Sequence, residues 1–357
     1  MKKSIVGVLK TKPETVVEDY GKLMRIVDYE SYLPKDKKTI VKLNLSWSLY
    51  YPACSTEPWQ LEGVLKTLRE DGYEDVMAME NKTVVTNPYK GIKQNKWENV
   101  LKKYDVEFVP LMEKKWIEYK PKADTPAIKK TFPDGHRIPE CFIGTNIVHL
   151  PTVKTHGHTT MTGAMKDAFG GLITERRHHA HKYIHEVLVD LLKIQKEIHT
   201  GIFAVMDGTV CGNGQGPRTM EPVIKNLILA SDDQVAIDSL SAKMMGFNPM
   251  GIKKLRLAND LGLGNGKPEN INVLGENIDN EDWGFEVGES PVIWGDKLFR
   301  KGILSFIEPI LFHTFLFNLA ILGSAFYHDY FWYPIAGMRN IRKFMKTEWG
   351  KLFLTYS

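Results

Sequence analysis

Short apolar runs alternate with helical repeats along most of the chain. Apolar runs bounded by turn-forming residues predict strands at 39–46, 75–81, 145–151, 201–208 and 226–232, with a further strand near the N-terminus. Apolar residues spaced three and four apart predict helices at 58–72, 184–198 and 234–246. Such alternation is typical of an α/β fold, in which a mainly parallel sheet carries helices on both faces.

Two stretches interrupt this pattern. Residues 82–143 are rich in Lys, Trp and Pro and contain a turn signal at 133–135, so we expect an inserted subdomain there. From residue 296 onward the chain becomes hydrophobic and rich in aromatic residues. The sequence therefore predicts an α/β domain over 1–295, with an insertion at about 82–143, and a C-terminal helical segment over 296–357.

Within the C-terminal segment, aromatic and apolar residues concentrate at 299–335. The most apolar run, 310–326, is shorter than the roughly 20 residues of a membrane-spanning helix. Basic residues flank it on both sides, which does not suit a single crossing. Contact with a membrane surface fits better, with cations on anionic lipid. Packing on the protein's own core and a homodimer contact are the alternatives.

Composition narrows the class of protein. A net charge of +4 and scattered basic residues do not indicate a nucleic-acid partner. The three cysteines are far apart, which fits a reducing compartment rather than a disulfide framework. The apolar run after the first two lysines is too short for a secretory signal. We expect a cytoplasmic protein, with peripheral attachment to the inner membrane face as one option.

Polar residues follow the predicted strands. Parallel strands place their carboxyl ends at one edge of a sheet, where ligands of open α/β folds bind. The polar residues at these positions are Lys42, Asn44, Glu80, Lys154, His156, His158, Asp207 and Asp233. Their recurrence predicts a shared site for an anionic small molecule or lipid.

The stretch LPTVKTHGHTTMTGAMKDAFGG (151–172) has the form of a strand, a loop and a helix. Thr159 or Thr160 can cap the helix, whose N-terminus would then attract an anion. Lys166 lies on that helix and could line the same site. An ordinary capped helix after a solvated loop is the alternative.

A glycine-rich run, GTVCGNGQGP (208–217), follows Asp207. It lacks the spacing of a phosphate-binding P-loop and of a dinucleotide fingerprint. We expect a loop whose backbone at Gly214 and Gly216 approaches a ligand closely, with a plain surface turn as the alternative.

Histidines cluster between His156 and His185. His181 and His185 are four residues apart and would share a helix face, so they could bind a divalent metal with a third ligand. No HExxH motif is present. Acid–base or anion-binding histidines and a solvated basic loop are the alternatives.

Together these motifs resemble the domain of unknown function 362 family. The matching pieces are VKLN (41–44), the region around EPWQLEGVLKTLREDG, LPTVKTHGHTTMTGAMKDAFGG (151–172), VDLLK (189–193), VMDGTVCGNGQGP (205–217) and ASDDQVAIDSLSAKMMGFNP (230–249). The resemblance implies an α/β fold. It also implies that the site residues are Lys42, Asn44, Glu80, Lys154, His156, Lys166, Asp207, Gly214, Gly216, Asp233 and Asp238.

Relatives in this family often carry cysteine motifs for iron–sulfur clusters, which this chain lacks, so an iron–sulfur cluster of its own is not expected. A looser similarity to the lactate racemase family, with its nickel-pincer cofactor, suggests proton or hydride chemistry on a small carboxylate. The cofactor itself is left open, and a divalent metal is one candidate.

The leading hypothesis is an enzyme for a small anionic or lipid-linked substrate, associated with a membrane surface. Its expected catalytic residues are Lys154, His156, His158, Lys166 and Asp207. Its expected substrate-binding residues are Lys42, Asn44, Glu80, Gly214, Gly216 and Asp233, and its expected metal ligands are His181 and His185. The alternatives are a non-catalytic membrane-associated binding or assembly protein, and a redox or racemase-type enzyme with a bound cofactor.

Overall fold

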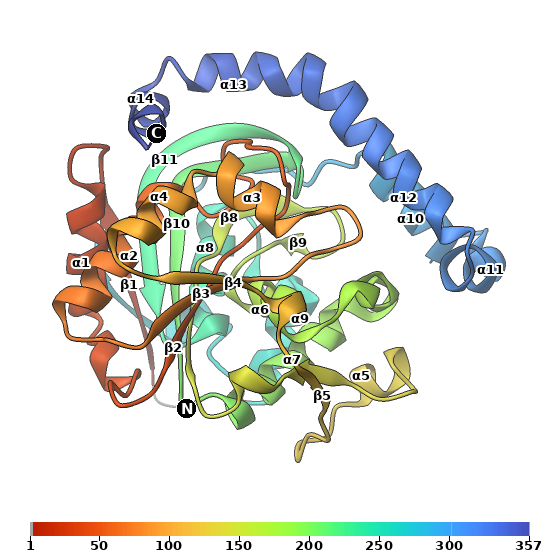
Figure 1. Cartoon of the computed structure of the whole chain (residues 1–357), viewed down its shortest axis with the longest axis horizontal. Coiled ribbons are helices and arrows are strands. Elements are labelled where there is room, and N and C mark those ends of the chain that lie inside the picture. The colour runs from red at the N-terminus through yellow and green to blue at the C-terminus, as the bar shows by residue number, and fades with distance from the viewer. Residues whose placement is uncertain (1–2, 301, 357) are drawn as a thin grey trace.

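The computed structural model describes residues 3–300 and 302–356 and contains one large central sheet (Figure 1). Across the sheet the strands follow the order β12 (Ile271–Gly275), β1 (Ser4–Lys10), β11 (Thr219–Ser231), β10 (Gly201–Gln215), β7 (Asn146–His149), β2 (Thr39–Lys42), β3 (Val76–Glu80) and β4 (Glu107–Pro110).

Most neighbouring strands run parallel. The pairs from β10 through β7, β2 and β3 to β4 are all parallel, and β1 is parallel to β12. Only β11 runs antiparallel to both of its neighbours, because it returns from β10 through a tight hairpin. The predicted α/β class with a mainly parallel sheet is confirmed. The expectation that the strand near 226–232 shares its carboxyl edge with the others is wrong.

Helices cover both faces of this sheet. The first face carries α1 (Val16–Ile26), α2 (Pro58–Glu70) and α4 (Trp97–Lys103), and the second carries α6 (Ala164–Leu172), α7 (Ile184–Ile198), α8 (Gln234–Met244) and α9 (Lys253–Asp260). Successive strand residues alternate between the two cores: Ile40 lies in one and Val41 in the other. Full burial of each such side chain contributes about 1.5–3 kcal/mol.

The stretch expected as an insertion is partly built into this fold. After β3, α3 (Pro88–Gln94) and α4 lead into β4, which pairs with β3 in the main sheet. Beyond β4 the chain leaves the sheet and forms a separate antiparallel pair, β5 (Trp116–Glu118) and β6 (Arg137–Pro139), with α5 (Pro126–Thr131) between them. The excursion therefore begins later than residue 82.

The glycine-rich run is largely strand rather than loop. β10 continues to Gln215, and its hairpin with β11 extends past the carboxyl ends of the parallel strands. There β10 also pairs with β8 (Thr152–His156), which pairs in turn with the short strand β9 (Thr160–Met161). A Cβ atom on Gly216 would lie 1.8 Å from the Thr155 carbonyl oxygen, so this glycine permits close packing of the hairpin against β8.

The C-terminal segment crosses the molecule and returns to it (Figure 1). It comprises α10 (Pro291–Arg300), α11 (Glu308–His313), α12 (Phe317–Ala325), the π-helix η8 (Phe326–Gly337), α13 (Met338–Phe344) and α14 (Glu348–Thr355). In α14, the ring centroid of Trp349 lies 5.1 Å from that of Trp59, and the ring centroid of Phe353 lies 3.8 Å from that of Tyr50. The end of the segment thus belongs to the core of the α/β domain.

Among the described residues, no helix has the length and apolar character needed to cross a membrane.

Candidate functional site

A cavity of about 570 Å³ lies beyond the carboxyl ends of β2 and β3. Its floor comes from the strand ends, the loop between β8 and β9, and α6. The tip of the β10–β11 hairpin forms a wall. Residues 291–300 and 302–328 of the C-terminal segment cover the cavity, and we call them the roof segment.

The cavity brings together part of the predicted site. The predicted residues that line it are Lys42, Asn44, Glu80, His156, His158, Lys166 and His181. The predicted residues outside its lining are Lys154, Asp207, Gly214, Gly216, Asp233 and His185. The cavity therefore lies where ligands of open α/β folds bind, at the carboxyl ends of the parallel strands. The direction of each strand and the packing of its side chains decide which of the predicted residues line the cavity.

A buried charge network forms part of the floor. Lys42 Nζ is 2.9 Å from Glu80 Oε2 and 3.8 Å from Asp167 Oδ1. The other Asp167 oxygen is 2.9 Å from His149 Nδ1, and His149 Nε2 is 2.8 Å from Gln195 Oε1. Burial raises the pKa of Glu80 although the Lys42 charge opposes it. Two carboxyl groups thus face the Lys42 ammonium, so little of its charge is left for a ligand.

Lys166 differs from Lys42. It lines the cavity from α6 and forms no hydrogen bond or ion pair with any described residue. Burial, with the charges of Lys154 and Lys254, lowers the pKa of its amine to about 7. Near neutral pH, Lys166 therefore exists as both ammonium and free amine.

The N-terminus of α6 is closed by a carboxylate. The helix begins at Ala164, after the expected caps Thr159 and Thr160, and neither caps it. Asp238 accepts a hydrogen bond from Ala164 N at 2.5 Å, and Lys254 Nζ donates to it at 3.0 Å. The expected anion site at this helix end is wrong because Asp238 occupies it. The family resemblance had included Asp238 among the site residues.

His156 is a neutral hydrogen-bond donor toward the cavity. Its Nδ1 accepts a hydrogen bond from His158 N at 3.2 Å, which leaves the proton on Nε2. Burial lowers the pKa of this ring well below its usual value, and the Lys166 charge lowers it further.

His158 and His181 meet a carboxylate of the roof segment. Asp296 Oδ2 lies 3.4 Å from His158 Nε2 and 3.6 Å from His181 Nδ1. His185 points elsewhere and accepts a hydrogen bond from Lys254 N at 3.2 Å. His181 lies in a 3₁₀ helix, η4 (Glu175–Tyr183), whereas His185 lies in α7, which begins at Ile184. The expected His181–His185 pair does not form because no single α-helix contains both residues.

Lys154 and Asp207 are core residues. Lys154 Nζ donates to the Cys54 carbonyl oxygen at 2.5 Å, and burial lowers the pKa of its amine to about 8. Asp207 accepts hydrogen bonds from Tyr20 Oη at 2.7 Å and from Trp59 Nε1 at 3.0 Å. Burial raises the pKa of Asp207. Both residues hold the strands under the cavity and do not line it.

The remaining predicted residues have structural positions as well. Gly214 offers its carbonyl oxygen to Thr155 Oγ1 at 2.8 Å, so it fastens the hairpin to β8. Asp233 lies at the opposite edge of the sheet, because β11 is antiparallel. There it caps α8 through Val235 N at 2.8 Å and accepts a hydrogen bond from Ser4 Oγ at 2.6 Å.

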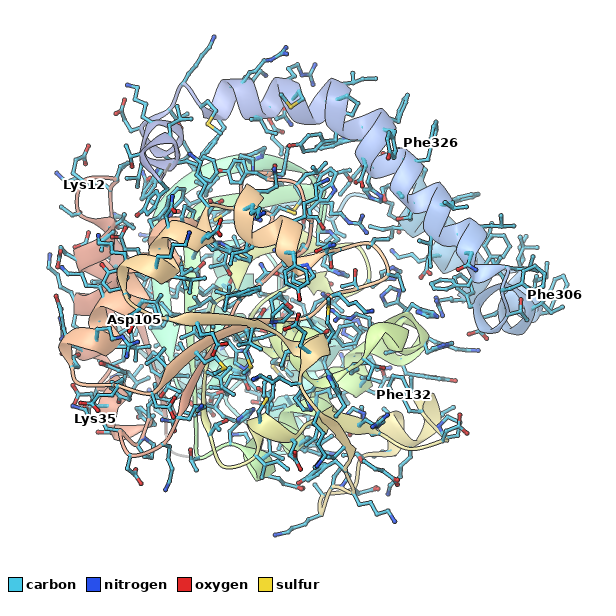
Figure 2. All side chains as sticks on the ribbon, in the orientation of Figure 1. Lys12, Lys35, Asp105, Phe132, Phe306 and Phe326 are labelled. Atoms are coloured by element: carbon cyan, nitrogen blue, oxygen red, sulfur yellow. The ribbon has the colours of Figure 1, made fainter. Side chains whose placement is uncertain are left out.

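The roof segment supplies an apolar ceiling. Its large apolar side chains that line the cavity are Ile293, Phe299, Leu311, Phe312, Phe317 and Ile321. Other residues of the roof segment face away from the α/β domain: Phe306 is 74% exposed and Phe326 is 66% exposed (Figure 2). The roof segment is therefore apolar on both sides.

The family model described as a domain of unknown function, DUF362, matches residues 39–243, more than half of the chain. The chain belongs to the DUF362 family. No curated protein and no solved structure matches it. The DUF362 match confirms the resemblance drawn from the sequence motifs.

The DUF362 match covers the floor of the cavity and stops before its roof. Lys42, Lys166 and the hairpin tip all fall inside 39–243, whereas the roof segment follows that range. In this DUF362 protein the matched domain therefore supplies most of the polar groups of the cavity, and residues after the match supply most of its large apolar side chains.

Several residues of the site were missed from the sequence of this DUF362 protein. They are Asp167, Arg177, Arg218, Asp296 and the apolar lining of the roof segment. Arg218 stands at the hairpin tip, and burial lowers the pKa of its guanidinium. One signal could have indicated the roof: Asp296 and His328 are polar residues within a strongly apolar tail, and both line the cavity.

Proposed function

We propose that this protein is an enzyme that moves a proton on an anionic substrate carrying a hydrocarbon chain, and that it works at a membrane surface. The observation that carries this proposal is the division of the cavity into a cationic polar half and an apolar half. A substrate with a charged head and an apolar tail is complementary to both halves at once.

The polar half favours an anionic head group. Lys166, Arg177 and Arg218 line it, and the first of these has no carboxylate partner among the described residues. Arginine and lysine in a partly dehydrated site bind phosphate or carboxylate strongly. A cationic head group would meet the two arginines, and a third positive charge whenever Lys166 is protonated, and would bind less well.

The apolar half favours a hydrocarbon chain. Ile293, Phe312, Phe317 and Ile321 form a continuous ceiling from α10 to α12. Transfer of each methylene group from water to such surroundings contributes about 0.8 kcal/mol. A free anion without a chain would gain nothing from this half.

Two groups on the floor support proton transfer. The free amine of Lys166 can accept a proton near neutral pH, since its pKa is about 7. His156 presents a neutral ring with its proton on Nε2, which can donate a hydrogen bond to a developing oxyanion. Catalysis by proton transfer near pH 7 requires groups of this kind.

The outer side of the C-terminal segment supports membrane attachment. Its exposed large apolar residues are Ile303, Phe306, Ile310, Phe315, Leu319, Leu322, Phe326, Tyr330, Phe331 and Ile335. Exposed basic residues, Arg339, Arg342 and Lys343, continue the same helical run. An apolar patch of this size marks an interaction surface, and each cation adds about 1 kcal/mol on anionic lipid.

Binding of dodecyl phosphate, below its micelle concentration, tests the proposed substrate class by calorimetry. We expect saturable binding that is at least tenfold tighter than binding of inorganic phosphate or of dodecyltrimethylammonium. Lys166→Met should weaken it, whereas the exposed Lys102→Met should not. Equal binding of the phosphate and the ammonium compound would refute the proposed head-group selectivity.

The rival function is a non-catalytic lipid-binding or assembly protein. Deuterium exchange at C2 of 3-oxododecanoate in D₂O, followed by NMR, separates the two. An enzyme should accelerate the exchange, and Lys166→Met should abolish the acceleration. A carrier would bind the compound and leave the rate of exchange unchanged.

A further inference from the structure

Three metal-binding side chains from three separate elements meet where the roof segment touches the floor. His158 comes from the loop between β8 and β9, His181 from η4 and Asp296 from α10. We propose that these three residues bind one divalent transition-metal ion, which fastens the roof segment to the floor.

The spacing of the ligand atoms fits such an ion. Asp296 Oδ2 is 3.4 Å from His158 Nε2 and 3.6 Å from His181 Nδ1, and the three ligand atoms all lie within 4.8 Å of one another. Metal–ligand bonds of about 2.0–2.1 Å in a tetrahedral arrangement separate neighbouring ligand atoms by about 3.3 Å. The two distances to Asp296 lie within a few tenths of an ångström of this value, and the His158–His181 distance, at most 4.8 Å, can be shortened by rotation of the two rings.

The atoms that face this point lack other partners. Asp296 Oδ2 and His181 Nδ1 are both buried and have no hydrogen-bond partner among the described residues. The His158 side chain is only 9% exposed. Buried polar atoms are nearly always satisfied, and a cation at this point would satisfy the carboxylate oxygen and both ring nitrogens.

The surroundings orient the carboxylate and balance its neighbours. Arg300 Nε donates to Asp296 Oδ1 at 2.9 Å, so Oδ2 is the oxygen left for the ion. The positive charge of Arg300 also faces Glu308 Oε1 at 3.8 Å, and Lys297 is paired with Glu289. Lys297 is therefore paired outside the site, whereas Arg300 holds the ligand carboxylate of Asp296 in place.

Two imidazoles and one carboxylate leave at least one coordination position open. This donor set is typical of catalytic zinc and of non-haem iron, and it is not typical of closed structural zinc sites. All three residues line the cavity, so the open position faces the proposed substrate space. The inference that metal binds here does not rest on the proposed function. The role of the open position in holding an anionic head group does rest on it.

Titration of the full-length, metal-stripped protein with Zn²⁺ and with Co²⁺ tests this inference. We expect about one equivalent of each metal to bind, and bound Co²⁺ to give the visible absorption of a four- or five-coordinate site. His158→Ala, His181→Ala and Asp296→Asn should each weaken Zn²⁺ binding at least tenfold. His185→Ala is the matched control, because His185 lies in the first turn of α7, four residues after His181, and outside the cavity lining; this variant should bind Zn²⁺ as the wild type does.

Hydrogen exchange gives a second readout, which is local to the site because it follows the opening of individual elements. Zn²⁺ should slow amide exchange in α10 of the wild type and leave exchange in the Asp296→Asn variant unchanged. Loss of Zn²⁺ binding in His185→Ala but not in His158→Ala would overturn the inference, as would wild-type protein that binds neither metal. The proposed function is tested separately, by dodecyl phosphate and vesicle binding. Failure of metal binding with both of these intact would therefore count against the metal site alone.

Discussion

Ile321 and Leu322 are neighbours on α12 and face opposite environments. Ile321 lines the cavity, whereas Leu322 is 64% exposed on the outer side of the segment. One helix therefore contributes an apolar side chain to the cavity and another to the outer surface that we propose binds a membrane. The two proposed roles of the C-terminal segment can be separated by changing adjacent residues.

Leu322→Asp should weaken binding to phosphatidylglycerol-containing vesicles at least tenfold and leave dodecyl phosphate binding unchanged. Burial of one such side chain contributes about 1.5–3 kcal/mol, which an exposed carboxylate forfeits. Ile321→Asp should weaken dodecyl phosphate binding and leave vesicle binding unchanged, because it places a negative charge in the cavity. Vesicle co-sedimentation and calorimetry measure the two effects. Full-length protein that ignores vesicles and is dimeric would instead assign the outer surface to a subunit contact.

Lys166 should react with acetic anhydride at a lower pH than other lysines. The neutral amine is the reactive form, and its fraction rises as the pH passes through the pKa, which is about 7 for Lys166. Peptide mass spectrometry should show half-maximal acetylation of Lys166 near pH 7, whereas lysine in an unstructured reference peptide reaches it near pH 10.4. Identical profiles would remove the argument for a neutral base in the cavity.

Asp238→Ala should strongly destabilise the fold. The change removes the cap of α6 and leaves the Lys254 ammonium, which is fully buried, without its carboxylate. Breaking a buried ion pair from one side costs about 3–5 kcal/mol. The free energy of unfolding in urea measures the loss, and Asp36→Asn at an exposed position is the control. A loss below about 1 kcal/mol would contradict this role of the pair.

Asp207→Asn should lower stability and leave ligand binding unchanged. Asp207 accepts hydrogen bonds from Tyr20, Trp59 and Thr209 in the core and does not line the cavity. An unsatisfied amide hydrogen there costs about 1–3 kcal/mol. Urea unfolding should show the loss, and calorimetry with dodecyl phosphate should give the wild-type dissociation constant. A large drop in affinity with unchanged stability would return Asp207 to the site.

Local periodicity was enough to predict the architecture. In α2 the stripe of Leu61, Leu65 and Leu68 marks the face that packs on the sheet, and all three side chains are fully buried. Lys42 and Glu80 could be placed at one edge because parallel strands share a direction. These inferences need only residues that are close together in the sequence.

Long-range pairing could not be predicted in the same way. Asp233 follows an apolar strand just as Glu80 does, and only the antiparallel pairing of β11 sends it to the other edge. Nothing near Asp296 in the sequence indicates that it meets His158 and His181. Such contacts depend on where the C-terminal segment folds back, and that is decided by the whole molecule.

The order in which the two halves of the cavity leave the ribosome follows from their order in the chain. Every floor residue precedes Pro291, and translation at about 5–20 residues per second delays the roof segment by several seconds. During that interval a nascent chain exposes a cationic half-site to water. The apolar helices that emerge afterwards complete the cavity only when they close over it, so premature release or stalling after α9 would yield an open intermediate without its apolar lining.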